Sequence, residues 1–402
     1  MLTLIFACFF KRIYTEEWLT EKTCEEDYTF NPSEPILKIP NDFQYSVPSY
    51  TEHSDYRKFI ESFPEIDSPE VFGLHPNADL TFRVKEATAL LHTLGETQPK
   101  GGGDNGGVSR EDIVYEKANE LLNRLPQDYV EEEYKLKIKK LGGMNVPMNI
   151  FLFQEIQRLQ NVIAKVRFVL QQLQLAIKGE VVMTTELQET IDSMFDAKVP
   201  DKWENTLTGD EFSWRLPTLG LWFSSLLNRD DQYHSWLDNG RPKSFWLTGF
   251  FNPNGCLTAM KQEVTRKHKT QKWALDDVVY HTEMTTYERA EQIKTPPQEG
   301  IYIHGLFLDG ATWSRSEGNL VESQPKVLFV PAPVLFVTGN TRKEEEKVKK
   351  EMFGPVGPYE CPVYKYANRT DRYFIFSANL KCTAERYPNK WALRGVAMLC
   401  NT

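Results

Sequence analysis

The sequence predicts an α+β fold, in which a helical N-terminal part is followed by a small antiparallel β-barrel. The first observation is the stretch 147–178, in which apolar residues recur at three- and four-residue steps, as they do along one face of an α-helix. The second is a series of short apolar or alternating runs after residue 271, separated by turn residues. Closing these strands into a barrel would remove exposed sheet edges, so we expect a barrel.

Length and composition predict a folded protein of two or three domains. The 402 residues are 41% hydrophobic and 12% aromatic, which supplies ample core. The net charge of -9 argues against a nucleic-acid partner, because phosphate binding depends on clustered Lys and Arg. The cysteines form no C-x-x-C pair, so we expect small core residues in a reducing compartment and no metal.

The N-terminal segment 1–24 is apolar at first and has no assigned role. Its run Leu2 to Phe10, followed by Lys11-Arg12, is much shorter than the ~20 residues that a spanning helix needs. It also lacks the basic start and the small-residue cleavage site of a signal peptide. We therefore expect no membrane partner, and interpret the segment as a buried helix or an atypical start.

Residues 25–100 predict a small helical subdomain. One helix is expected over Tyr50 to Phe63, and a second over Asp79 to Leu94. The second helix is predicted to turn one apolar face inward, formed by Leu80, Val84, Ala87, Leu90 and Leu91. His75 has no second His or Cys at ligand spacing, so we expect a structural residue and not a metal ligand.

Residues 101–108 predict a glycine-rich linker. Gly101 to Gly107 reads GGGDNGG, and Val108 stands where a phosphate-binding loop needs its Lys. No nucleotide is therefore expected on this chain.

Residues 109–270 predict a helical domain. Ser109 and Asp112 have the spacing of a capping box. The periodic stretch predicts one helix of roughly 30 residues, ~45 Å long, which Gly179 ends. The charged and amide side chains between its apolar positions are expected to form a solvated face: Gln154, Glu155, Arg158, Lys165 and Arg167.

An aromatic stretch joins the helical half to the strand-rich half. Thr218 is placed to cap a helix, and the run Phe245 to Phe251 predicts a buried strand that ends in a turn at Asn252-Pro253. A further helix follows the turn. The basic run Arg266 to Lys269 is expected to be its solvated end.

Residues 271–402 predict the barrel. The expected strands are 277–286, 301–308, 327–330, 334–337, 359–366, 373–378 and 394–400. The charge-rich run Arg342 to Glu351 interrupts them, and predicts an exposed loop or short helix. Its expected helix pairs are Glu345 with Lys349 and Glu346 with Lys350.

No pattern in the sequence predicts catalytic chemistry. The words G-x-S-x-G and H-E-x-x-H do not occur. His281 and His304 lie in predicted strands, where we expect hydrogen-bonded structural histidines and not general bases. Tryptophans within apolar runs are expected to anchor the core and not to form a sugar-binding platform: Trp214, Trp222, Trp236, Trp246, Trp273, Trp313 and Trp391. No catalytic residue, cofactor-binding residue or metal ligand is therefore expected.

Several long words resemble the C-terminal region of dynein heavy chains, and their wording is closest to axonemal members of the outer arm. They are LGLWFSSLL at 219–227, GRPKSFWLTGFFNP at 240–253, LTAMKQEV at 257–264, WALDDV at 273–278, GIYIHGLFLDG at 300–310, PKVLF at 325–329 and KWALRGVA at 390–397. Upstream, DSPEVFGLHPNAD at 67–79 resembles the small helical part of the sixth AAA+ module.

The resemblance implies a non-catalytic portion of an ATP-driven microtubule motor for ciliary or flagellar movement, one that caps and modulates the AAA+ ring. Its implied partners are the rest of that ring and, through the whole complex, dynein intermediate and light chains and microtubules. ATP and Mg are implied only for the full-length motor, and the implied location is the cytoskeleton of the axoneme. A structural role is implied for the motif residues Phe72, Gly73, Asn77, Asp79, Trp222, Phe223, Trp246, Gly249, Phe250, Asn252, Pro253, Gln262, Trp273, Gly305, Gly310, Trp391, Arg394 and Gly395.

Two other functions stay open on the residues alone. The first is a free-standing β-rich binding or regulatory module that uses its aromatic surface to hold a partner. The second is a cryptic hydrolase, which no constellation of residues supports.

Overall fold

The structure is a computed structural model that describes residues 52–61, 77–97, 109–206, 210–383 and 388–401. The protein divides into two compact units. The first unit comprises Met1–Gln98 with Gln324–Leu328, and the second comprises Pro99–Ser323 with Phe329–Thr402. The predicted role of segment 1–24 and the predicted linker 101–108 lie outside the described residues.

The first unit contains the two helices that the sequence predicts. They are α3 (His53–Glu61) and α4 (Asn77–Thr97). The prediction that α4 turns an apolar face inward is wrong for Val84, Ala87, Leu90 and Leu91, all of which are exposed. The physical reason is that none of the described residues of this unit covers that side of the helix.

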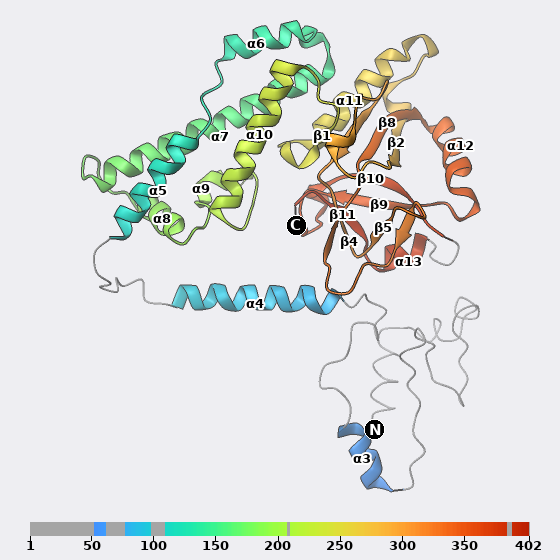
Figure 1. Cartoon of the computed structure of the whole chain (residues 1–402), viewed down its shortest axis with the longest axis horizontal. Helices are drawn as coiled ribbons and strands as arrows, with labels where there is room; N and C mark the ends of the chain where they lie inside the picture. The colour runs from blue at the N-terminus through green and yellow to red at the C-terminus, as the bar shows by residue number, and fades with distance from the viewer. Residues whose placement is uncertain (1–51, 62–76, 98–108, 207–209, 384–387, 402) are drawn as a thin grey trace. The chain divides into compact units, whose positions relative to one another are not determined.

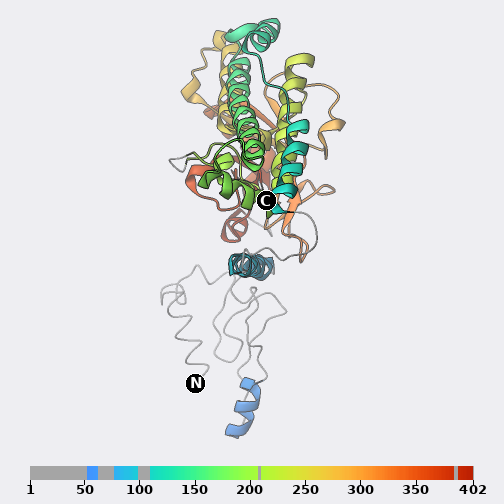
Figure 2. The same ribbon diagram turned by 90° about the vertical axis from the view of Figure 1, so that its left-hand side faces the viewer.

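The second unit begins with a bundle of helices. Figures 1 and 2 show α5, α7 and α10 alongside one another, and α7 contacts both of the others. The helices are α5 (Arg110–Arg124), α6 (Glu131–Lys140), α7 (Pro147–Ile177), α8 (Thr185–Phe195), α9 (Asp201–Glu204), α10 (Leu219–Asn239) and α11 (Pro253–Lys267).

The long helix α7 confirms the predicted period and length. It spans 31 residues and begins at Pro147, whose fixed φ suits the first helical position. Gly179, at φ +78°, follows its end. Its buried apolar stripe contains Phe151, Leu152, Ile156, Leu159, Val162, Ile163, Val166, Leu170 and Leu173. The expected solvated face is wrong for Glu155, which is 1% exposed because it binds the turn described below.

Local capping fixes where α5 and α10 begin. Ser109 accepts a hydrogen bond from the backbone of Asp112, whose side chain accepts one from the Ser109 backbone in return. This confirms the predicted capping box. Thr218 likewise accepts from the Leu221 N–H, and so caps α10 as predicted.

The rest of the second unit contains two main sheets and a hairpin. One sheet has the strand order β1-β3-β8-β2, the other has the order β10-β9-β11-β4-β7, and β5 pairs with β6. The strands are β1 (Phe245–Trp246), β2 (Val278–Met284), β3 (Ile301–His304), β4 (Phe307–Asp309), β5 (Thr312–Ser314), β6 (Asn319–Val321), β7 (Phe329–Pro331), β8 (Leu335–Thr341), β9 (Pro358–Tyr364), β10 (Phe374–Lys381) and β11 (Ala397–Leu399). Helices α12 (Arg342–Phe353) and α13 (Pro388–Leu393) lie between them in sequence.

The mixed α+β class is confirmed, whereas closure into one barrel is not. Gly305, at φ +84°, divides the predicted run 301–308 into β3 and β4, which belong to different sheets. The sheets also approach each other at β2 and β10, where the Thr282 hydroxyl accepts a hydrogen bond from the Asn379 N–H at 2.7 Å. The described strands form no backbone ladder between β2 and β10, so the Thr282 side chain makes this contact between the two sheets.

The predicted strand Phe245 to Phe251 is wrong beyond Trp246. A 3-10 turn, η4 (Leu247–Gly249), replaces its second half, and the Phe250 N–H bonds to the Leu247 carbonyl. An apolar run of this length does not distinguish a strand from a buried turn, because both bury every side chain.

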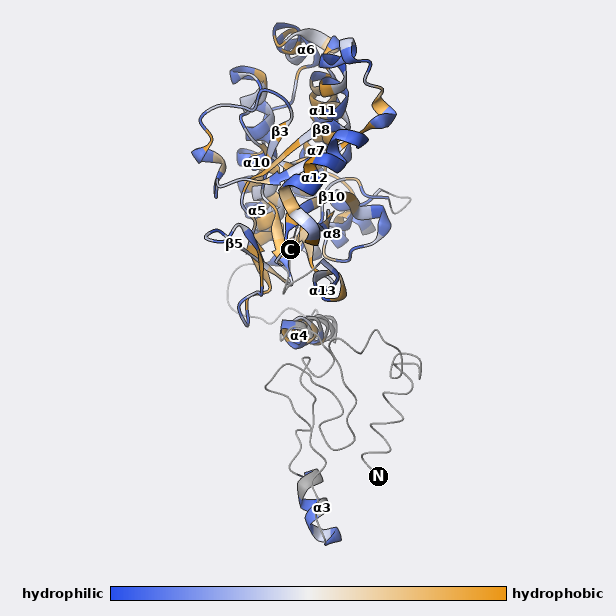
Figure 3. Cartoon of the chain, turned by 90° about the vertical axis from the view of Figure 1, so that its right-hand side faces the viewer, coloured by the Kyte–Doolittle hydropathy of each residue, from blue (hydrophilic) through white to orange (hydrophobic). Residues whose placement is uncertain are grey.

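The charge-rich run forms the helix α12, but its predicted ion pairs are wrong. Glu345 is buried, and its carboxylate lies 2.9 Å from Nδ1 of His281 on β2. Lys349 pairs with Glu360 on β9, at 2.8 Å. Figure 3 shows α12 as a hydrophilic helix beside more hydrophobic strands. The buried carboxylate of Glu345 thus holds α12 against β2, whereas most of the other charged side chains of this helix are exposed.

The core of the second unit is rich in aromatic residues. Trp214, Trp222, Trp236 and Trp391 are buried, as predicted, whereas Trp246, Trp273 and Trp313 are only half-buried. The free cysteines of the described part are all buried: Cys256, Cys361, Cys382 and Cys400. Among the described helices, none is long and apolar enough to cross a bilayer.

Candidate functional site

A buried carboxylate organises the junction between helices and sheets. Glu155 of α7 accepts hydrogen bonds from the backbone N–H groups of Phe251 and Asn252, at 2.6 and 3.1 Å. The Tyr233 hydroxyl donates to it as well, at 3.0 Å. Burial raises the pKa of Glu155, and the Phe251 N–H is the largest influence that opposes the shift. The carboxylate therefore clamps the turn that follows η4.

The same turn is held from its other side by a cation. The Phe251 carbonyl accepts a hydrogen bond from the Lys365 ammonium at 3.3 Å, and this ammonium also pairs with Glu211 at 2.8 Å. Burial lowers the pKa of Lys365, while Glu211 raises it. The N–H and the carbonyl of one residue are thus bound by two different ionisable side chains, both largely buried, and the Lys365 ammonium is paired with Glu211.

A second buried cation, Arg229 of α10, lies among aromatic rings. Its guanidinium carbon is 4.0 Å from the centre of the Trp214 ring and 5.4 Å from that of Trp246, which is within cation–π range. The guanidinium donates to the Thr248 carbonyl at 3.1 Å. Burial lowers the pKa of Arg229 to about 10, so the group stays charged near neutral pH.

Thr248 connects three distant parts of the sequence. Its carbonyl accepts from Arg229, and its hydroxyl lies 3.0 Å from the carbonyls of Gly305 and Cys400. The predictions from sequence did not include Thr248, Arg229 or Glu155 as site residues. In the sequence, only Thr248 is an isolated polar residue inside an apolar run, whereas Glu155 and Arg229 stand beside other polar residues and carry no such signal.

Two predicted motif glycines lie against one predicted tryptophan. A Cβ atom at Gly249 or at Gly305 would stand 2.4 Å from an atom of the Trp246 ring. Gly305 also has φ +84°, a conformation that side chains disfavour. The half-buried ring of Trp246 therefore lies where only glycine fits.

The other motif residues of the aromatic stretch pack or cap. Phe250 meets Phe151 edge-on, with ring centres 4.8 Å apart. Asn252 accepts from the Gly255 N–H and so caps α11, in which Pro253 is the first residue. Further motif residues are Trp222 and Phe223 in the core, and the half-buried Gln262.

The motif residues near the C-terminal strand form another group. Trp391 is fully buried, whereas Arg394 pairs with Glu322, which Lys390 also contacts at 3.3 Å. Burial lowers the pKa of Arg394. Gly395 and Gly310 both have positive φ, at +64° and +81°.

The motif residue Trp273 stacks on His268, with ring centres 4.1 Å apart.

The upstream motif residues belong to the first unit. Asn77 is buried, donates to the Val327 carbonyl at 2.7 Å and accepts from the Lys326 N–H at 2.8 Å. Asp79 pairs with Arg83 along α4 at 2.8 Å. Phe72, Gly73 and His75 lie outside the described residues.

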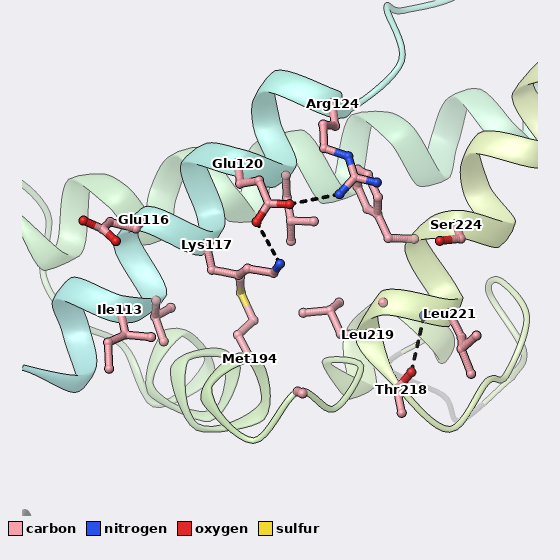
Figure 4. Close-up of a pocket in the computed structure, with 15 residues that line it drawn as sticks. Ile113, Glu116, Lys117, Glu120, Arg124, Met194, Thr218, Leu219, Leu221 and Ser224 are labelled. Atoms are coloured by element: carbon pink, nitrogen blue, oxygen red, sulfur yellow. Dashed lines mark hydrogen bonds and ion pairs between the residues drawn. The ribbon is translucent and has the colours of Figure 1, made fainter.

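The second unit also carries a groove of about 910 Å³ between α5 and α10 (Figure 4). Met194, Leu219 and Phe223 contribute apolar surface to it. On its rim, Glu120 hydrogen-bonds to Lys117 and Arg124, at 2.8 and 2.9 Å. Both cations lower the pKa of Glu120, and Lys117 has the larger effect.

The described residues offer little that resembles a reaction centre. Within them, no group of three or more His, Cys, Asp and Glu side chains is arranged to hold a metal ion. Nδ1 of His304 lies 2.7 Å from the Ser244 hydroxyl, and burial lowers the pKa of this histidine. His281 is bonded to Glu345, as described above. Both histidines are hydrogen-bonded within the fold.

Comparison with known proteins identifies the family of this sequence. The family model for the C-terminal domain of dynein heavy chains matches residues 84–400, and the one for their AAA lid domain matches residues 10–78. The protein is 43% identical to Dynein axonemal heavy chain 8 of Homo sapiens over 390 residues, which are 96% of this sequence and 8% of that protein.

Two further relatives show the same pattern. Dynein axonemal heavy chain 5 of Mus musculus is 42% identical over 96% of this sequence and 8% of its own length. The Dynein gamma chain, flagellar outer arm, of Chlamydomonas reinhardtii is 42% identical over 89% of this sequence and 8% of its own length. The protein thus spans less than a tenth of these relatives. It belongs to the dynein heavy chain family, within which it corresponds to the AAA lid and the C-terminal domain.

Proposed function

We propose that this protein serves as the C-terminal portion of an axonemal dynein heavy chain, where it caps the AAA+ ring and modulates its changes of shape. The observation that carries the proposal is the order of the two matches, lid first and C-terminal domain second, over residues 10–400. The rest of the ring is the direct partner. Intermediate chains, light chains and microtubules are partners of the whole complex, and the location is the axoneme of a cilium or flagellum.

This portion contributes structure to the motor and does not itself hydrolyse ATP. In this proposal ATP and Mg bind elsewhere in the heavy chain, and the hydrogen bonds of Glu155, Lys365 and Arg229 hold the junction of the cap together. The aromatic junction is the part that joins its helical and sheet halves. A free-standing binding module is not favoured by the comparisons, since the relatives are heavy chains throughout.

The groove between α5 and α10 is the contact surface that we assign to the ring. Ile113 and Leu221 line it and are 46% and 53% exposed, although both are apolar. An apolar segment of the ring would bury these side chains at a gain of about 25 cal/mol for each Å² removed from water. The charged rim around Glu120 suits the polar edge of such an interface.

The test is binding of the full protein to a dynein ring fragment that lacks this region. We expect association, and we expect Leu221→Glu and Ile113→Glu to weaken it at least tenfold. Leu393→Glu is the matched control, because Leu393 is 82% exposed on α13, away from the groove residues. No association of the unmodified protein would contradict the proposed cap, and equal binding by all three variants would exclude the groove as the contact.

A separate measurement tests whether the protein hydrolyses ATP. We expect the purified protein to release no phosphate from ATP, with or without microtubules. Steady ATP hydrolysis by the protein alone would contradict its assignment as a non-catalytic portion.

A further inference from the structure

We infer that the junction of the α6 and α11 ends is a docking surface for an acidic peptide segment. The surface is formed by the side chains of Lys139, Lys140, Arg266, Lys267, Lys269 and Lys272, called the basic corner below. It is independent of the groove and of the proposed contact with the ring.

Two segments that are far apart in sequence form this corner. Lys139 and Lys140 close α6, and Asn145 follows shortly after them. The Arg266 guanidinium at the end of α11 donates to the Asn145 carbonyl. The end of α11 therefore contacts the turn η3 (Gly143–Asn145), which follows the basic end of α6. The sequence predicted a solvated helix end here and did not indicate this contact.

The cations of the corner are exposed and have no carboxylate partner among the described residues. Arg266 and Lys267 are held by backbone carbonyls, those of Asn145 and Gln298. Of the nearby acids, Glu263 pairs with Arg241 at 2.7 Å, while Glu299 lies 2.9 Å from His268 inside the basic run, where it and Glu344 raise the pKa of that histidine. Asp276 and Asp277 follow the corner in sequence and mark its boundary.

Two comparisons support a surplus of positive charge at the basic corner. Earlier on α6, Lys135 pairs with Glu131 at 2.6 Å and Lys137 pairs with Asp238 at 2.5 Å, so neighbouring lysines do find partners. A helix C-terminus carries only about half a negative charge, which one cation suffices to offset. The C-terminal ends of α6 and α11 therefore offset only a small part of the positive charge of the basic corner. The protein as a whole has a net charge of -9.

The occupant follows from that contrast of charges. A short acidic peptide can bring its carboxylates to the corner and leave the acidic remainder of the protein untouched. A long nucleic acid would extend its phosphates over that remainder and be repelled by it. Exposed lysines also suit flexible carboxylates, since each ammonium is a mobile point charge without a fixed fork geometry.

The experiment measures binding of a fluorescein-labelled dodecamer of alternating Glu and Gly to the full protein. The reference peptide has Gln in place of Glu. We expect binding of the Glu peptide only, weakened at least fivefold between 50 and 200 mM NaCl by screening. The patch variant, K139E with K140E and K269E, is expected to lose at least tenfold in affinity.

The matched control changes the same charge elsewhere. Lys347 and Lys350 lie on the later turns of α12 and Lys381 ends β10, so K347E with K350E and K381E alters the net charge equally. We expect less than a twofold effect, with unchanged melting of both variants. Equal losses in the two variants, no binding of the Glu peptide, or equally tight binding of a single-stranded RNA dodecamer would each overturn the inference.

Discussion

Oε2 of Glu155 lies 2.6 Å from the backbone nitrogen of Phe251, although 96 positions separate the two residues in sequence. This contact ties the longest helix to the turn that begins the sheet half. Replacement by alanine would leave two buried N–H groups without an acceptor.

We therefore expect Glu155→Ala to lower the free energy of unfolding by about 3 kcal/mol, because each buried donor without a partner costs roughly 1–3 kcal/mol. Glu189→Ala, at an exposed site on α8, is the control and should change it by less than about 0.5 kcal/mol. Urea denaturation measures both. Equal effects at the two sites would mean that the clamp contributes nothing.

Gly305→Ala should destabilise the protein far more than Gly318→Ala. Both glycines have positive φ, at +84° and +64°, so both variants incur about 1–2 kcal/mol of backbone strain. Only at Gly305 would the new Cβ meet the Trp246 ring, at 2.4 Å. We expect a further loss of about 2 kcal/mol there, from overpacking. Thermal unfolding followed by circular dichroism compares the pair, and similar melting temperatures would contradict the predicted clash.

The two motif tryptophans should differ in their cost. Trp222 is fully buried and stacks on Trp214, with ring centres 4.9 Å apart. Trp222→Ala is expected to cost about 3–5 kcal/mol. Trp246 is only half-buried, so we expect Trp246→Ala to cost about 1–3 kcal/mol by the same reasoning. Denaturant titration ranks them, and a larger loss at Trp246 would show that its contacts with Arg229 and the glycines outweigh burial.

The hydrogen bond between His234 and Asp230 should make stability depend on pH. Asp230, at 3.1 Å, raises the pKa of His234 above its usual value near 6.5. The protonated form is then favoured by folding, so its contribution is fully present below about pH 6.5 and disappears as pH rises through the folded pKa.

His234→Gln should therefore lower the melting temperature more at pH 6 than at pH 8.5. The control is the same substitution in the Asp230→Asn background, where this difference between the two pH values should vanish. A penalty that is the same at both pH values in the native background would mean that the histidine contributes only by packing.

The buried thiols should resist modification. Burial raises the pKa of Cys400 to about 12, and raises that of Cys256 and Cys361 as well. In a C8S, C24S variant, we expect a thiol reagent at pH 8 to label almost nothing in the native state. All remaining cysteines should react after unfolding in guanidinium. Rapid native labelling would contradict the burial of these residues.

Local patterns allowed the helices to be predicted well. The apolar period of α7 and the capping box at Ser109 are properties of neighbouring residues, and both are confirmed. The α+β class is confirmed for the same reason. The family words also indicated correctly to which proteins the sequence is related.

Contacts between distant residues could not be predicted in this way. Glu155 reads as one more solvated charge on a helix, because its donors lie 96 and 97 positions away. Glu345 has the spacing to pair with Lys349, but it is buried against His281 instead. The turn at Leu247–Gly249 and the break at Gly305 depend on tertiary packing, which an apolar run does not encode.

Because α7 is one uninterrupted helix, the directions in which its side chains point are all fixed relative to one another. Each residue of an α-helix rotates the next by ~100°, so one inserted residue in the middle of α7 would swing Glu155 away from its turn or the distal leucines away from theirs. The two ends of the bundle cannot be adjusted separately. Insertions and deletions should therefore accumulate in the loops around α7, and its length should vary little among functional variants.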